Sequence, residues 1–201
     1  AAVKVGSCLS CFRSAKVEPT GVQLQRLAEQ NLTVDVVQIT TKDEATLLGL
    51  EFSNGGRVHN YNLVRWIGQG TSGNVFEAEL DGKPYAIKVI KQQDDDVRKE
   101  LEAWNKVNHS PYVIELFHAF SYVHKTGKKE TVRGKERDQT MNYYFFAMEL
   151  AISDGQSYFK HLYLQPTPVP HQETTVRDAV LQVALGLKHL HDNDLVHTDL
   201  K

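Results

Sequence analysis

The sequence predicts an α+β fold, in which a small antiparallel sheet and one helix precede a longer helix. Three observations lead to this prediction. Apolar runs typical of strands follow one another between residues 61 and 90, and Asp81-Gly82 separates two of them as a hairpin turn does. Apolar residues then recur at helical spacing over 97–108. They do so again, over a longer stretch, in 174–193.

Composition sets the class of protein before any single residue is considered. The chain has 201 residues, of which 41% are apolar and 24% charged, and this balance is typical of globular domains rather than disordered chains. The formal net charge of −2 excludes a protein that holds nucleic acid by charge alone. Two cysteines cannot build a disulfide framework. Without a signal peptide or a long apolar run, we expect an intracellular protein, cytoplasmic or nuclear.

Residues 1–60 differ from the rest and are expected to form a partly ordered N-terminal extension. A helical pattern occupies 22–30, a strand pattern 33–40, and a helix start 41–51. The turn residues of 53–56 then form a linker. The segment GSCLSC would attach the chain to a membrane by acylation only if Gly6 followed an initiator methionine.

The remaining elements follow in a simple order. Strands are predicted at 61–68, 74–80 and 84–90, a helix at 97–108, and one or two strands at 112–120. A polar loop at 125–137, a buried strand at 143–151 and a proline-rich break at 165–170 follow. The polar loop holds six cations against two acids, a local net charge of 6 − 2 = +4. We expect it to be a solvated insertion or a docking loop.

The first motif with chemical content is GQGTSGNV at 68–75. In a dinucleotide-binding fold, G-x-G-x-x-G stands between a strand and a helix, whereas here two predicted strands flank it. This context favours a flap whose backbone N–H groups approach the phosphates of a nucleoside triphosphate. The alternative is a hairpin whose glycines only allow tight turning.

The second feature with chemical content is Lys88, which interrupts the apolar strand YAIKVI. Burying an ammonium group is costly unless a carboxylate accompanies it. Glu100 on the following helix is the best candidate partner, and Glu102 is the second. Lys88 would then bind phosphate, whereas Lys91 is expected to face solvent.

With these residues, YAIK, NHSPYVIEL, MELA and the final HTDLK, the chain resembles eukaryotic-type protein kinases of the serine/threonine class. The resemblance covers 61–201. It implies a small lobe with hinge at 61–151, made of a twisted antiparallel sheet plus one helix, and the start of a helical large lobe at 152–201.

The resemblance also implies site residues and cofactors. Lys88, Glu100, Asp199 and Lys201 would be catalytic, with Asp199 aligning the substrate hydroxyl and Lys201 near the γ-phosphate. Val75 and Ala86 would cover adenine, Met148 would be the gatekeeper, and ATP with Mg²⁺ would be the cofactors. The implied ATP-binding residues are Ile67, Gly68, Gln69, Gly70, Thr71, Ser72, Gly73, Asn74, Val75, Ala86, Lys88, Met148, Glu149 and Ala151.

Two departures from the family stand out. Thr198 replaces the usual arginine of the catalytic loop, and HTDLK is similar to the LAMMER, or CDC-like, kinases. The family's metal-binding asparagine and aspartate would come after Lys201, so the chain as given holds no metal ligands of the family. We therefore expect an inactive fragment, in which the apolar surface of the helix at 176–191 is exposed to solvent.

Two other functions stay open. The chain could be a pseudokinase or truncated kinase that serves as a nucleotide- or protein-binding scaffold, or a small-molecule kinase of related fold. Lys88, Glu100 and Asp199 favour an enzyme, and HTDLK favours protein substrates. We expect a protein substrate and no nucleic-acid partner.

Overall fold

The computed structural model describes residues 3–5, 33–39, 56–70, 73–91, 94–132, 135–151 and 172–197, together with residues 155, 157 and 160. The chain forms two compact units. The first consists of Val34–Lys99 and Leu116–Leu150, and the second of Ala1–Thr33, Glu100–Glu115 and Ala151–Lys201. The expected helices at 22–30 and 41–51, the segment GSCLSC and the motif residues Thr198, Asp199 and Lys201 lie outside the described residues.

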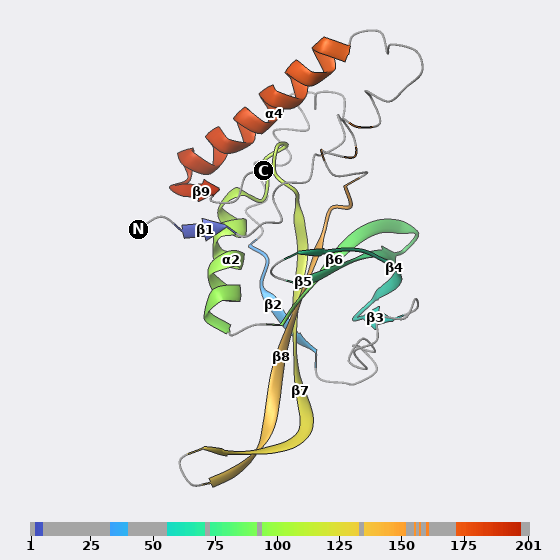
Figure 1. Cartoon of the computed structure of the whole chain (residues 1–201), viewed down its shortest axis with the longest axis vertical. Helices are drawn as coiled ribbons and strands as arrows, with labels where there is room; N and C mark the ends of the chain where they lie inside the picture. Colours follow the sequence, from blue (N-terminus) through green and yellow to red (C-terminus); the bar gives the residue numbers. More distant parts are fainter. Residues whose placement is uncertain are drawn as a thin grey trace. The chain divides into compact units, whose positions relative to one another are not determined.

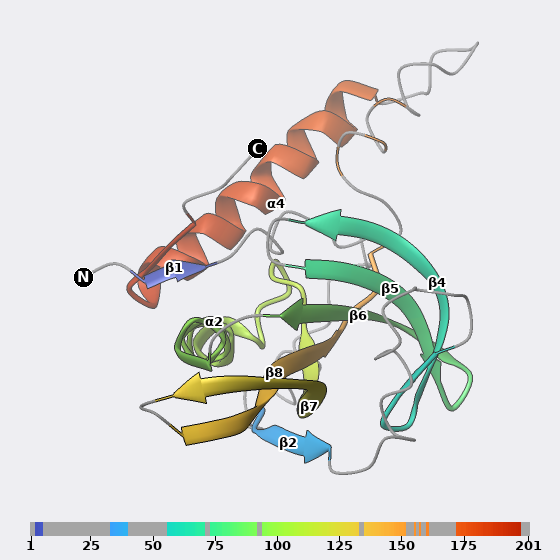
Figure 2. The same cartoon turned by 60° about the horizontal axis from the view of Figure 1, so that its bottom comes forward.

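The first unit is built on a curled seven-stranded sheet (Figures 1 and 2). The strand order is β2-β7-β8-β6-β5-β4-β3. All neighbouring strands are antiparallel except β2 and β7, which are parallel. The bounds are β2 Val36–Ile39, β3 Arg57–Val58, β4 Tyr61–Gly70, β5 Gly73–Leu80, β6 Lys83–Lys91, β7 Leu116–Val132 and β8 Lys135–Met148. The predicted α+β class and the antiparallel central sheet are confirmed, and β2 adds a parallel edge strand from the N-terminal extension.

The turn between β5 and β6 explains why these strands pair in this register. Asp81 and Gly82 both have positive φ, 52° and 71° respectively, as a two-residue hairpin with right-handed strand twist requires. Glycine adopts this conformation without penalty, and aspartate tolerates it better than most residues. The turn therefore aligns Leu80 with Lys83, and the ladder continues to Asn74 and Val89.

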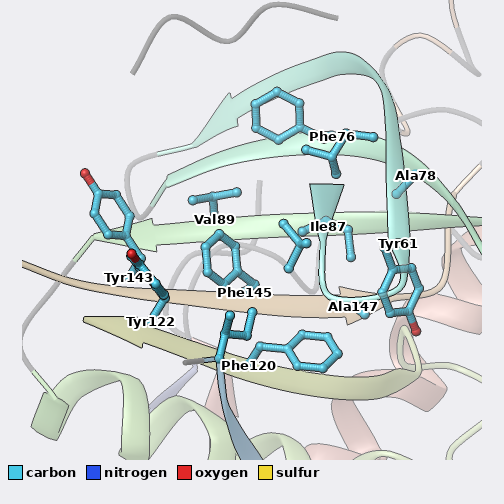
Figure 3. Packing of buried hydrophobic residues seen from close by; sticks show 13 residues of the cluster. Tyr61, Phe76, Ala78, Ile87, Val89, Phe120, Tyr122, Tyr143, Phe145 and Ala147 are labelled. Atoms are coloured by element: carbon cyan, nitrogen blue, oxygen red, sulfur yellow. The ribbon is translucent and has the colours of Figure 1, made fainter. Parts of the chain in front are cut away.

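One face of the sheet carries the hydrophobic core of this unit (Figure 3). Phe76 and Ala78 from β5, Ile87 and Val89 from β6 and Phe145 from β8 all point into it. Because side chains alternate along a strand, the residues between them point to the opposite face. The remaining buried members are Ile39, Val58, Tyr61, Leu63, Phe120, Tyr122, Tyr143 and Ala147.

The prediction of a polar loop at 125–137 is wrong, because β7 and β8 extend into this segment and form a long hairpin (Figure 1). Lys129 pairs with Asp138 and Glu130 with Arg137 across the two strands. Lys129 Nζ also lies 3.0 Å from Glu136 Oε2. Opposite charges at neighbouring cross-strand positions stabilise a pair of strands, so a charged segment can form a ladder without apolar cover.

The second unit contains most of α2 (Asp94–Val107), which begins in the first unit, together with α4 (Gln172–Asp192), β1 (Val3–Val5) and β9 (Leu195–His197). The two long helices agree with the predicted ones. β1 and β9 form a parallel pair. The apolar core of this unit joins α2, α4 and β9 through Ala103, Val107, Val113, Leu190 and Leu195.

The segment between α2 and β7 differs from its prediction. A strand was expected at 112–120, but β7 begins at Leu116, and Tyr112 to Glu115 form a turn and irregular chain. Trp104 explains the difference, since its Nε1 donates a hydrogen bond to the Ile114 carbonyl at 2.9 Å. This bond, with the burial of Val113 and Ile114, ties the backbone to the helix instead of to a strand.

Among the helices that the structure describes, none is long and apolar enough to cross a membrane. α4 comes nearest in length but is interrupted by charged residues. It nevertheless exposes two large apolar side chains, Val180 at 62% and Leu181 at 55%.

Candidate functional site

Three adjacent strands bring four of the predicted nucleotide-binding residues together. In the ladder between β5 and β6, Val75 lies opposite Lys88 and Glu77 opposite Ala86. In the ladder between β6 and β8, Ala86 lies opposite Met148. These residues alternate with Phe76, Ile87 and Ala147, which point into the core on the other side of the sheet (Figure 3). Val75, Ala86, Lys88 and Met148 therefore share the face opposite the core.

Lys88 is almost fully buried, with 2% of its surface exposed. Its neighbours across the ladders, Val75 and Phe146, are apolar. An ammonium group in such surroundings is stable only when charged or polar groups compensate it. Lys91, three residues further along β6, is exposed, as predicted for a surface lysine.

Glu100 lies on α2 and is also buried, with 8% of its surface exposed. It shares its side of the helix with Val97, Leu101 and Trp104, whereas the second candidate, Glu102, is exposed. Lys88 belongs to the first compact unit and Glu100 to the second. The Lys88–Glu100 ion pair therefore stays a prediction.

The glycine motif is a hairpin between β4 and β5. Gly68 pairs with Val75, Gln69 with Asn74, and Gly70 with Gly73. Two paired antiparallel strands on either side of the motif differ from the strand and helix that flank it in a dinucleotide-binding fold. The tip of the hairpin, Thr71 and Ser72, lies outside the described residues.

Two glycines of this hairpin differ in what the fold requires of them. Gly73 has φ of +152°, and a Cβ at this position would lie 1.9 Å from the carbonyl oxygen of Val89. A side chain there is impossible without displacing the backbone. A Cβ on Gly68 would meet nothing within 4 Å, so neither packing nor backbone conformation requires glycine there. Close packing therefore explains Gly73 but leaves Gly68 without a structural role.

The end of β8 closes this face of the sheet. Met148 is the last residue of the strand and is buried between Ala86 on β6 and Leu116 on β7. Glu149 and Leu150 follow it and are half-buried. The predicted hinge thus begins where the sheet ends. The next residue, Ala151, belongs to the second unit.

The predicted catalytic loop follows β9. Leu195 anchors this strand, since it is fully buried in the core of the second unit, and His197 is half-buried. Asp199 comes two residues after the end of β9, in a part of the chain that the structure does not describe. The roles of Asp199 and Lys201 accordingly stay predictions.

One residue of this face was missed in the sequence. Glu77 lies two positions after Val75 and therefore on the same side of β5. Its Oε2 atom lies 2.6 Å from Arg65 Nη2 on the neighbouring strand. Strand alternation could have revealed Glu77, but its partner could not have been found, because β4 does not keep a regular register with β5.

The protein kinase domain family model matches residues 61–201. The chain belongs to the protein kinase family.

Several curated kinases are similar to this chain. Serine/threonine-protein kinase ppk18 of Schizosaccharomyces pombe is 27% identical over 154 residues, which are 72% of this chain and 10% of that protein. The human serine/threonine-protein kinase greatwall is 25% identical over 151 residues, 72% of this chain and 14% of its own length. Human protein kinase C eta type is 27% identical over 167 residues, 79% of this chain and 21% of its own length. The chain thus spans only a minor part of these relatives.

Proposed function

We propose that this protein kinase chain binds ATP on the face formed by β5, β6 and β8, and that the protein transfers the γ-phosphoryl group to serine or threonine hydroxyls of protein substrates. The observation that carries the proposal is the placement of buried Lys88 on one face with Val75, Ala86 and Met148, next to the glycine hairpin. An apolar surface beside a fixed cation suits a ligand with a flat base and a polyphosphate.

The residues present fit such a ligand. Ala86 has a small side chain, and a bulkier one beside Met148 would narrow the space for a base. Gly68 supports the phosphate side of the site, because a Cβ there would meet nothing within 4 Å and the backbone therefore has open space beside it. Lys88 would bind the α- and β-phosphates, and Glu100 would hold Lys88 in place. Mg²⁺, when bound with ATP, would neutralise charge on the β- and γ-phosphates.

The choice of protein hydroxyls as acceptors rests on the residues after β9. Asp199 would accept a hydrogen bond from the substrate hydroxyl and align its oxygen with the γ-phosphorus. Lys201, two residues later, follows the pattern of serine/threonine kinases that the resemblance implies. The names of the relatives ppk18 and greatwall agree with this class.

The proposal is tested by comparing Lys88→Met with Lys91→Met. Both remove a lysine from β6, but Lys88 is buried and Lys91 is exposed. Binding of MgATP is measured by calorimetry, and phosphotransfer is measured with a serine- and threonine-containing peptide library. We expect Lys88→Met to abolish transfer and Lys91→Met to leave both measurements unchanged.

Two results would change the conclusion. Equal ATP binding and turnover in Lys88→Met and the unaltered protein would exclude the assigned site. ATP binding without transfer in the unaltered protein would favour the alternative function, a nucleotide-binding scaffold.

A further inference from the structure

The β4–β5 ladder is irregular where it approaches the glycine hairpin. Leu63 pairs with Ala78 and Arg65 with Glu77, so Val64 is an extra residue on β4. A second shift follows between Trp66 and Gly68, and Ile67 is the extra residue there. Each such insertion moves all later side chains of the strand relative to its partner.

This irregularity has a direct consequence for the glycine motif. Gly68 lies opposite Val75 only because the two shifts fall where they do. If β4 slipped by one residue, the glycine would move away from Val75 and a side chain would take its place. Arg65 and Trp66, which lie between the two shifts, are the last residues of β4 to pair with β5 before the glycine motif.

Arg65 and Glu77 form an ion pair at this point. The two residues lie directly opposite each other, with Nη2 and Oε2 2.6 Å apart. The Glu77 side chain is 23% exposed and the Arg65 side chain 63%, and the Oε2 atom itself is enclosed by protein. The contact is an ion pair rather than a well-aligned hydrogen bond, because Oε2 has no hydrogen bond of regular geometry within the described structure.

A second contact holds the same segment on the other face of the hairpin. Trp66 Nε1 donates a long hydrogen bond of 3.4 Å to Asn74 Oδ1 on β5. Trp66 itself lies opposite Phe76, a residue of the core. This bond is weak and exposed, so the charged pair is the stronger restraint on register.

We propose that the Arg65–Glu77 ion pair fixes the register of the glycine hairpin and so positions Gly68 and Val75 for nucleotide binding. A slip of β4 by one residue would put Val64 or Trp66 opposite Glu77. The enclosed carboxylate would then lose its guanidinium partner, which is costly for a charge with little access to water. Arg65 and Glu77 are positioning residues. The part of this proposal that concerns nucleotide affinity depends on the proposed function, whereas the part that concerns register does not.

The register is tested by amide hydrogen exchange, followed by NMR, on Arg65→Met, Glu77→Gln and the exchanged pair Arg65→Glu/Glu77→Arg. In both single variants, the amide hydrogens of Gly68 to Val75 should exchange about two- to fivefold faster. A larger effect is not expected, because an ion pair this exposed contributes only modestly to stability. The double variant Arg65→Glu/Glu77→Arg, in which the two charges are swapped, should restore slow hydrogen exchange. Lys129→Met and Glu136→Gln are the matched controls, because they break a cross-strand ion pair in the β7–β8 hairpin of the same sheet.

Nucleotide affinity is then measured with MgATP on the same proteins. We expect about two- to fivefold weaker binding in each single variant, recovery in the exchanged pair and no change in the controls. Unchanged exchange at 68–75 in both single variants would overturn the proposal. So would acceleration spread evenly over the whole sheet, which would indicate general stability. If the unaltered protein bound no MgATP, the proposed function would fail, and the exchange data would still decide the role of the ion pair.

Discussion

The Tyr61 hydroxyl and His118 Nδ1 lie 2.5 Å apart and form a hydrogen bond that joins the first residue of β4 to β7. Tyr61 is buried in the core, whereas the side chain of His118 is exposed. Burial, followed by the charge of Tyr85, raises the pKa of Tyr61. Burial lowers the pKa of His118 from 6.5, and His59 lowers it further. Folding therefore makes both groups harder to charge than in the unfolded chain.

The histidine makes stability dependent on pH. Because the folded state lowers the pKa of His118, the unfolded chain binds the proton more readily. The contribution of His118 to stability is complete above the unfolded pKa of 6.5 and is lost as pH falls below it, through the lower pKa of the folded state. We expect the melting temperature to fall between about pH 7 and pH 5, and His118→Gln to reduce this fall. His191→Gln, which alters a histidine of α4, is the control. An identical pH profile in His118→Gln would contradict the prediction.

The two glycines of the hairpin should respond differently to alanine. Gly73→Ala places a methyl group 1.9 Å from the Val89 carbonyl oxygen at a positive φ, so we expect a loss of about 2 kcal/mol or more in the free energy of unfolding. Gly68→Ala has free space and should change stability by less than about 0.5 kcal/mol. If Gly68 serves ligand approach, the same substitution should weaken MgATP binding. Urea unfolding and calorimetry measure the two effects, and equal stability of the two variants would be the contrary result.

Trp104 should be the most sensitive position of α2. It is fully buried, and its indole N–H donates to the Ile114 carbonyl. Trp104→Phe keeps an aromatic ring but leaves this carbonyl without its donor and a gap in the core. We expect a loss of about 1–3 kcal/mol by urea unfolding. Lys106→Met, an exposed change on the same helix, should have little effect, and a similar loss in both variants would argue against the assigned role.

The apolar surface of α4 can be altered without touching a core. Val180 and Leu181 are largely exposed, so replacing both with glutamine alters mainly solvent-facing surface. We expect reduced binding of an apolar dye and less aggregation, with the free energy of unfolding changed by less than about 0.5 kcal/mol. Ala179→Gln is the matched control. Because Ala179 is buried on the same helix, this variant should have a lower free energy of unfolding. Unchanged dye binding in the double variant would place the apolar surface elsewhere.

Asp199→Asn tests the assigned role of the aspartate. The asparagine keeps the size of the side chain but removes the carboxylate that would align the substrate hydroxyl. In the active protein we expect phosphotransfer to fall by about two orders of magnitude or more, with MgATP affinity nearly unchanged. Measuring both quantities in one preparation separates the two roles. A large loss of ATP affinity in a folded variant would contradict the assignment.

The sequence predicted the features that depend on local patterns. Asp81-Gly82, the alternation around Lys88 and the period of α2 and α4 are short-range signals, and the structure contains the corresponding hairpin, strand and helices. The features that depend on pairing could not be predicted in the same way. The charges of Glu130 and Arg137 suggested a solvated loop, whereas the two residues lie opposite each other on neighbouring strands. Arg65 likewise has no evident partner until the irregular register of β4 places it opposite Glu77.

The two tryptophans of the chain lie in contrasting surroundings, and this gives the protein two separable optical signals. Trp66, beside the glycine hairpin, is 49% exposed, whereas Trp104 is 2% exposed. Exposed indoles emit at longer wavelength and are quenched by iodide, and enclosed indoles are not. Emission at the red edge therefore reports on the hairpin, and emission at the blue edge reports on α2. A ligand that orders the hairpin should shift only the first component, so that occupancy and unfolding can be followed separately in one unlabelled sample.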